Sequence, residues 1–101
     1  MATSTKALFR GAATTNTGTT LYTTPSGSSA VVTNIAVSNT AASTSTATIA
    51  LNGTNIVPTV NIPANTVIVV DLKQVLAATQ TITGGASTTA VTLHISGVEI
   101  A

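Results

Sequence analysis

Short segments in which apolar and polar residues alternate with a period of two recur along the whole chain. In residues 46–51, TATIAL, the side chains of Ala47, Ile49 and Leu51 alternate with threonine and alanine. This period predicts a β-strand with one face buried and the other turned outward. The outward face carries hydroxyl and methyl groups, where most soluble proteins carry lysine and glutamate.

Turn signals separate these segments at fairly even spacing, which is typical of an all-β sandwich or barrel. No segment keeps a helical period over the length that a helix needs. We therefore predict a single antiparallel β-sandwich of seven or eight strands, jelly-roll-like or immunoglobulin-like, and the sequence leaves these two topologies open. The predicted strands are 6–13, 20–24, 30–39, 46–51, 55–62, 66–72, 80–83 and 88–100.

Two of these strands have informative faces. In 30–39, the alternation predicts that Val31, Thr33, Ile35 and Val37 share one face. Segment 66–72, TVIVVDL, is almost continuously apolar, which predicts a strand covered on both faces.

Glycine, asparagine and proline mark the turns and irregular positions. Asn52-Gly53 predicts a two-residue hairpin turn. Pro58 cannot donate a ladder hydrogen bond, so its strand is predicted to be an edge strand or to be bulged there. A bulge at Ser96-Gly97 is predicted to shift the phase of the last strand, so that Val98 and Ile100 face the core.

The composition fits one domain with an aliphatic core. Of the 101 residues, 44% are hydrophobic but only 2% are aromatic, so valine, isoleucine, leucine and alanine must fill the interior. We expect the sandwich to span 19–101, preceded by an N-terminal arm, 1–18, that contains a possible first strand.

Charged residues make up 5% of the chain, against about 25% in an ordinary domain. The three cations Lys6, Arg10 and Lys73 are too few for a nucleic-acid footprint, so no nucleic-acid partner is expected. A net charge of +1 gives little repulsion between copies, so we expect self-association or a surface for a partner.

The chain contains neither cysteine nor a long apolar segment. Because there are 0 cysteines, disulfides and thiolate metal sites are excluded. The N-terminus contains no signal-peptide pattern, and no segment approaches the roughly 20 apolar residues of a membrane span. We therefore expect synthesis in a cytoplasm and no membrane partner.

The few titratable residues do not form a catalytic motif. Asp71, His94 and Ser96 supply the residue types of a nucleophile triad, but His94 and Ser96 lie two apart on one strand without an elbow turn. One histidine and two distant carboxylates are too few for a metal site unless copies meet at a threefold axis. We predict no enzyme activity, no cofactor and no resident metal.

The two aromatic residues suggest different roles. Tyr22 lies between Leu21 and Thr23 and is interpreted as a core-edge tyrosine with its hydroxyl at the rim. Phe9 lies near Lys6 and Arg10, and it either anchors the chain in a neighbour or caps its own core. We take Lys6, Phe9 and Arg10 as a hypothetical interface.

Three stretches carry a family resemblance: TLYTTPSGSSAVVTNIAVSNT (20–40), NIPANTVIVVDL (61–72) and ISGVEI (95–100). From about Lys6 to Ile100 the chain resembles small virion proteins of tailed bacteriophages, most closely the capsid decoration, or cement, proteins. That family commonly has glycine after PA and a Gly-Asp pair before the following strand. Here Asn65 and Thr79-Gln80 stand at those positions.

The resemblance implies a β-sandwich that binds the outer capsid surface as an oligomer, often a trimer, and ties major capsid protein subunits together without catalysis. We therefore expect a virion protein on the capsid surface that is made in the host cytoplasm. The alternative is a tail, neck or fibre module for virion attachment or recognition of a host glycan. The scarcity of aromatic residues counts against glycan binding.

Overall fold

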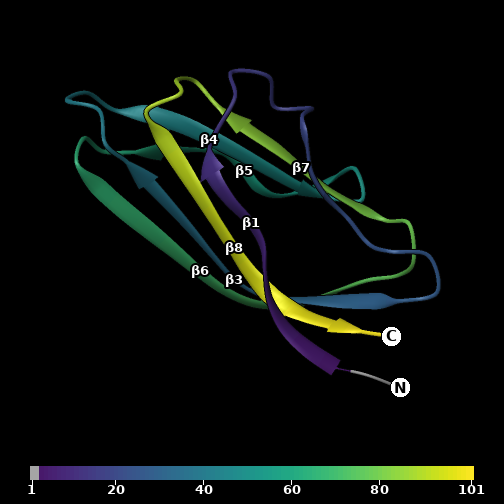
Figure 1. Cartoon of the computed structure of the whole chain (residues 1–101). Coiled ribbons are helices and arrows are strands. Elements are labelled where there is room, and N and C mark those ends of the chain that lie inside the picture. Colours follow the sequence, from purple (N-terminus) through teal and green to yellow (C-terminus); the bar gives the residue numbers. More distant parts are fainter. Residues whose placement is uncertain (1–2) are drawn as a thin grey trace.

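The computed structural model describes residues 3–101 as strands and the turns that join them (Figure 1). All strands pair antiparallel in two sheets of four, which confirms the predicted all-β sandwich. Within this range there is no helix that is long and apolar enough to cross a membrane. The strands are β1 (Thr3–Ala12), β2 (Thr20–Thr23), β3 (Ser29–Asn39), β4 (Ser45–Leu51), β5 (Thr54–Ile62), β6 (Thr66–Leu76), β7 (Thr81–Ala86) and β8 (Val91–Ile100).

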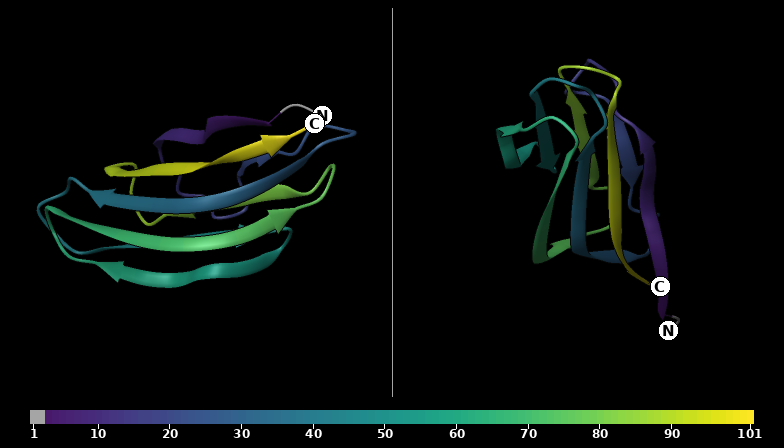
Figure 2. Two further views of the ribbon diagram at one scale, coloured as in Figure 1. Left: turned by 90° about the horizontal axis from the view of Figure 1, so that it is seen from below. Right: turned by 90° about the vertical axis from the view of Figure 1, so that its left-hand side faces the viewer.

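The strand order is nested. Sheet A has the order β1-β8-β3-β6, and sheet B has the order β2-β7-β4-β5 (Figure 2). β4 therefore pairs with β5, β3 with β6, β2 with β7 and β1 with β8, as in a long antiparallel ribbon that has been rolled up. This order is that of a jelly roll, and it decides between the two topologies that the sequence left open.

A single layer of aliphatic side chains fills the space between the sheets. Burying each of these side chains stabilises the fold by about 1.5–3 kcal/mol. Tyr22, at 9% exposure, adds an aromatic ring at one end of the layer. The largest fully buried aliphatic side chains are Val32, Ile35 and Val37 of β3, Val91, Leu93 and Ile95 of β8, Ile49 of β4, Ile62 of β5, Leu76 of β6 and Ile82 of β7.

A line of irregularities crosses sheet A at one level. β1 has an extra residue, Leu8, relative to β8, and β3 has an extra residue, Thr33, relative to the same strand. The register between β3 and β6 also shifts beside Thr33. β8, which lies between β1 and β3, alternates regularly between buried and partly exposed residues from Val91 to Val98.

These irregular positions in sheet A correct two predictions about which side chains face the core. The bulge at Thr33 reverses the phase of β3, so that Val32, not Val31, is buried with Ile35. The bulge predicted at Gly97 is wrong, because the extra residues lie in the neighbouring strands. Glu99, not Val98, therefore turns toward sheet B, where it accepts a hydrogen bond from Tyr22.

The predicted turn and edge positions are confirmed. Asn52 and Gly53 have φ of 49° and 81°, the left-handed pair that a tight β4–β5 hairpin requires. Pro58 lies in β5, an edge strand whose register shifts nearby, and Thr59 beside it has φ of 51°. Asn65 takes the left-handed conformation, with φ of 53°, in the β5–β6 turn.

A buried amide ties the two sheets together at one end. Asn39, at the end of β3 and 1% exposed, donates from Nδ2 to the carbonyl oxygens of Ser43 at 2.9 Å and Ile62 at 3.0 Å. Its Oδ1 accepts from the backbone N–H of Ala41 at 3.0 Å. One side chain of sheet A thus satisfies backbone groups of the β3–β4 connection and of β5 in sheet B.

We expect Gly97→Ala to lower the free energy of unfolding by about 2–3 kcal/mol, because overpacking a tight site forces the backbone to shift. A Cβ at Gly97 would collide with the carbonyl oxygen of Val31 and lie 2.9 Å from Leu8 Cδ1. Urea unfolding measures the effect.

Gly11→Ala, on the adjacent strand β1, is the matched control. Its Cβ would lie 3.6 Å from Phe9 Cζ, an ordinary contact, so a change within about 1 kcal/mol is expected. Equal effects at the two glycines would contradict the close approach at Gly97.

Candidate functional site

The charged side chains are confined to one of the two sheets. Every charged residue and the single histidine lie on β1, β6 or β8, all strands of sheet A. The strands of sheet B and the connecting loops are built from uncharged residues. The molecule therefore presents two faces of different chemistry. The titratable residues of sheet A are Lys6, Arg10, Asp71, Lys73, His94 and Glu99.

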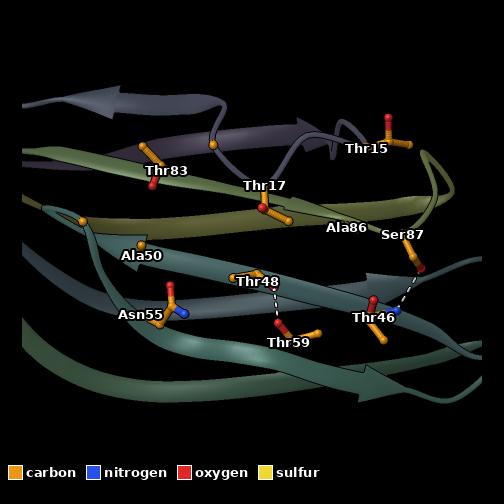
Figure 3. A pocket seen from close by; sticks show the side chains of 12 residues that line it. Thr15, Thr17, Thr46, Thr48, Ala50, Asn55, Thr59, Thr83, Ala86 and Ser87 are labelled. Atoms are coloured by element: carbon orange, nitrogen blue, oxygen red, sulfur yellow. Dashed lines mark hydrogen bonds between the residues drawn. The ribbon is translucent and has the colours of Figure 1, made fainter.

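The outer face of sheet B is hollowed into a shallow groove of about 510 Å³ (Figure 3). β4 forms the floor with Thr46, Thr48 and Ala50, and β5 and β7 lie on either side. The hydroxyls of Thr48 and Thr59 are 2.9 Å apart and share a hydrogen bond, so part of the floor is internally satisfied. The groove offers hydroxyl, amide and methyl groups, and its lining contains neither a charge nor an aromatic ring.

The loop between β1 and β2 forms one wall of this groove. Thr14 and Thr19 in this loop accept hydrogen bonds from the backbone of β7, at 2.9 and 3.0 Å, so the loop extends the sheet beyond the short β2. Gly85 permits this approach, because a Cβ there would lie 2.6 Å from the carbonyl oxygen of Asn16. The wall is therefore a hydrogen-bonded part of the sheet.

The outer face of sheet A carries an exposed apolar row on β6. Val67, Val69 and Val75 are 54%, 58% and 69% exposed. This row contradicts the expectation that 66–72 is covered on both faces. The nested strand order makes β6 an edge strand, so its outer face is open.

The three residues of the hypothetical interface lie on β1, which pairs with β8 as the other edge of sheet A. Lys6 Nζ donates to Glu99 Oε1 at 3.2 Å. Phe9 is half-buried and packs against the core, whereas Arg10 is exposed opposite His94. The structure thus brings the three residues onto one strand but gives each a different environment.

Sequence reasoning missed a polar cluster at the rim of the core. The hydroxyl of Tyr22, a core-edge tyrosine as predicted, donates to Glu99 Oε2, while Lys6 contacts the other carboxylate oxygen. The bond from Tyr22, assisted by Lys6, lowers the pKa of Glu99. Burial, followed by the nearby carboxylate, raises the pKa of Tyr22. Regular alternation through Gly97 was the signal that would have placed Glu99 on the inner face.

The residue types of a triad are not brought together. Asp71 accepts a hydrogen bond from Asn34 Nδ2 at 2.9 Å. Asn34 lies between Asp71 and Ser96 in one row across the sheet, so these two are separated by two strand spacings, roughly 9.5 Å. His94 lies in the adjacent row, opposite Ala36. Within residues 3–101, no three histidine, aspartate or glutamate side chains cluster in a way that would hold a metal ion.

Comparisons of the chain with family models, curated proteins and solved structures found no match. The two faces, the groove and the open β6 edge are therefore the observations from which a function must be argued.

We expect Glu99→Gln to remove part of the acid-induced loss of stability. The pKa of Glu99 is lowered from 4.5 in the folded chain, so its carboxylate stabilises the fold above that value. This contribution is lost as the pH falls through the folded-state pKa. Urea unfolding midpoints measured from neutral pH down to pH about 3 should fall less steeply in the variant than in the wild type.

Asp71→Asn is the control, because it removes the other carboxylate of the chain and leaves the Tyr22–Glu99 contact in place. This variant should still show the loss of stability on acidification that Glu99 causes. If Glu99→Gln and the wild type lose stability in parallel on acidification, Glu99 is not the responsible group.

Proposed function

We propose that this protein is a structural virion subunit that docks, through the uncharged outer face of sheet B, on a repetitive protein shell. The function is that of a capsid decoration protein of tailed bacteriophages. The observation that carries the proposal is the confinement of all charged side chains to sheet A. This leaves a hydroxyl- and methyl-covered face on sheet B.

Such a face suits protein docking because little has to be desolvated. Burying an unpaired charge is costly, whereas hydroxyl groups that already share hydrogen bonds, as Thr48 and Thr59 do, lose less on leaving water. Threonine and serine also lose little side-chain entropy on binding. Depletion of charge is a property of the buried centre of protein interfaces.

The mechanism is passive. The partner is the major capsid protein, and the subunit binds the outer capsid surface as an oligomer, for which the family resemblance suggests a trimer. Binding to the assembled lattice and not to free capsid subunits shifts the equilibrium toward the assembled shell. Many weak contacts repeated over the lattice add up by avidity. No cofactor takes part.

Fold analogy is a second line of support for the proposal. Jelly rolls occur in viral capsid and lectin domains, but one fold hosts many functions. Arg10, exposed on β1, remains a candidate for a second contact from sheet A. Lys6 and Phe9 are already engaged with Glu99 and with the core.

The groove favours one alternative, a tail, neck or fibre module that binds a host glycan. The hydroxyl and amide groups that line the groove can hydrogen-bond to sugar hydroxyls. Binding of the purified protein to a glycan array, together with failure to bind capsids, would favour this alternative.

We expect the protein to sediment with undecorated phage capsids at a fixed ratio to the capsid protein. Asn55→Lys, which places a charge at the edge of the groove, should weaken this binding roughly tenfold or more, because the new charge must be desolvated without a partner. Co-sedimentation at several protein concentrations gives the affinity.

Thr92→Lys is the matched control, because it adds the same charge to the outer face of sheet A. It should bind as the wild type does. If Thr92→Lys weakens binding and Asn55→Lys does not, the docking face is sheet A. If the wild type does not sediment with capsids, the decoration function is wrong.

A further inference from the structure

The two sheets have four edge strands, and three of them carry features that block the addition of another strand. β1 carries Lys6 and Arg10 and is interrupted by the extra residue Leu8. β2 has only 4 residues. β5 contains Pro58 and shifts in register. Charges, bulges, proline and short length are the devices by which natural sheets protect their edges.

β6 is the edge that lacks most of this protection. It has 11 residues, without proline or glycine. Its register against β3 shifts at Leu72 and Lys73, which lie opposite the single residue Thr33, but β6 itself keeps its outward residues at odd positions from Val67 to Lys73. Its two charges, Asp71 and Lys73, are of opposite sign. Among residues 3–101, its backbone hydrogen-bonds only in the ladder with β3. One side of the strand therefore presents a row of free N–H and C=O groups, which is a template for strand addition.

The side chains of β6 are apolar on both of its faces. Val67, Val69 and Val75 face outward and are more than half exposed. Ile68 and Val70 face the core but are only partly buried. A strand added alongside would cover apolar surface on both faces at once.

The order of the outward side chains is self-complementary. Asp71 and Lys73 flank Leu72, and Val69 and Val75 lie at equal distances beyond them. In an antiparallel pair of β6 strands with a twofold axis at Leu72, Asp71 of each copy faces Lys73 of the other. Val69 likewise faces Val75. Opposite charges and β-branched pairs at such positions stabilise a sheet.

Other registers lose this match. A slip of one residue places the outward face of one copy beside the core face of the other. A shift of the axis to Val70 sets Asp71 against Val69 and Lys73 against Val67. A parallel in-register pair sets Asp71 beside its own counterpart, and like charges directly opposite destabilise a sheet.

We propose that β6 is a homodimerisation edge, where two copies of the chain pair antiparallel and join their A sheets into one continuous sheet. The occupant of this edge is a second copy because the charges of β6 are complementary to those of β6 itself. The contact uses sheet A, so it is independent of docking through sheet B and can coexist with a threefold contact elsewhere.

The first test is the mass of the purified full chain in the absence of capsids, measured by sedimentation equilibrium over a wide concentration range. The species that forms should contain an even number of 9.9 kDa chains. Lys73→Asp should weaken dimerisation roughly tenfold or more, since it sets two pairs of like charges opposite each other. The double variant Asp71→Lys with Lys73→Asp should restore it.

Arg10→Asp is the control, because it makes the same charge change on β1, at the far edge of sheet A. It should leave the mass unchanged. Urea unfolding checks that each variant is folded, since Asp71 also accepts a hydrogen bond from Asn34. A monomer or trimer whose mass is insensitive to Lys73→Asp would overturn the proposal.

A cross-link tests the register independently. The chain has 0 cysteines, so Leu72→Cys introduces a single thiol, and the twofold axis places it beside its own copy. Directly opposite Cα atoms in an antiparallel pair are roughly 4.5–5.5 Å apart, within the range of a disulfide. Mild oxidation should give a covalent dimer of Leu72→Cys and not of Thr92→Cys. Equal cross-linking of both variants would show random collision.

Discussion

Burial of one thin aliphatic layer between two four-stranded sheets is the interaction on which the rest of this structure depends. The chain has no disulfide and almost no aromatic residues, so isoleucine, valine, leucine and alanine fill most of the interior. Within sheet A, the irregular pairing of β3 and β8 leaves no room for a side chain at Gly97, whose Cβ would collide with the carbonyl oxygen of Val31 on the neighbouring strand. At one end of the layer a buried amide, Asn39, hydrogen-bonds from sheet A to the backbone of β5 in sheet B.

The charged side chains are divided unequally between the two sheets, and the core is closed by different groups at each. The rim of the core on sheet A is sealed by a polar cluster in which Glu99 accepts from Tyr22 and Lys6. On sheet B the turns and the β1–β2 loop close the layer with backbone hydrogen bonds, without charged groups. The result is one face on which a protein partner can dock at little desolvation cost and another that carries all the ionic contacts.

The local pattern of apolar and polar residues was sufficient to predict the fold class, and single residues predicted several turns and edges. Period-two alternation with valine, isoleucine and threonine predicts strands, and the structure confirms eight of them in two sheets within residues 3–101. The hairpin at Asn52-Gly53, the irregular edge at Pro58 and the core-edge position of Tyr22 also follow from the chemistry of single residues. Even the uncharged character of the surface is a compositional fact.

The sequence by itself thus determined the strands, the turns and the scarcity of charge, because these depend on residues close together in the chain. Only the tertiary structure decided the jelly-roll order, the faces around Thr33 and the partner of Glu99. Each of these depends on which distant strands pair, and the extra residues in β1 and β3 cannot be recognised without β8 between them. The apolar run of β6 resembles a central strand in sequence, and it is an edge because the rolled-up ribbon places no strand beside it.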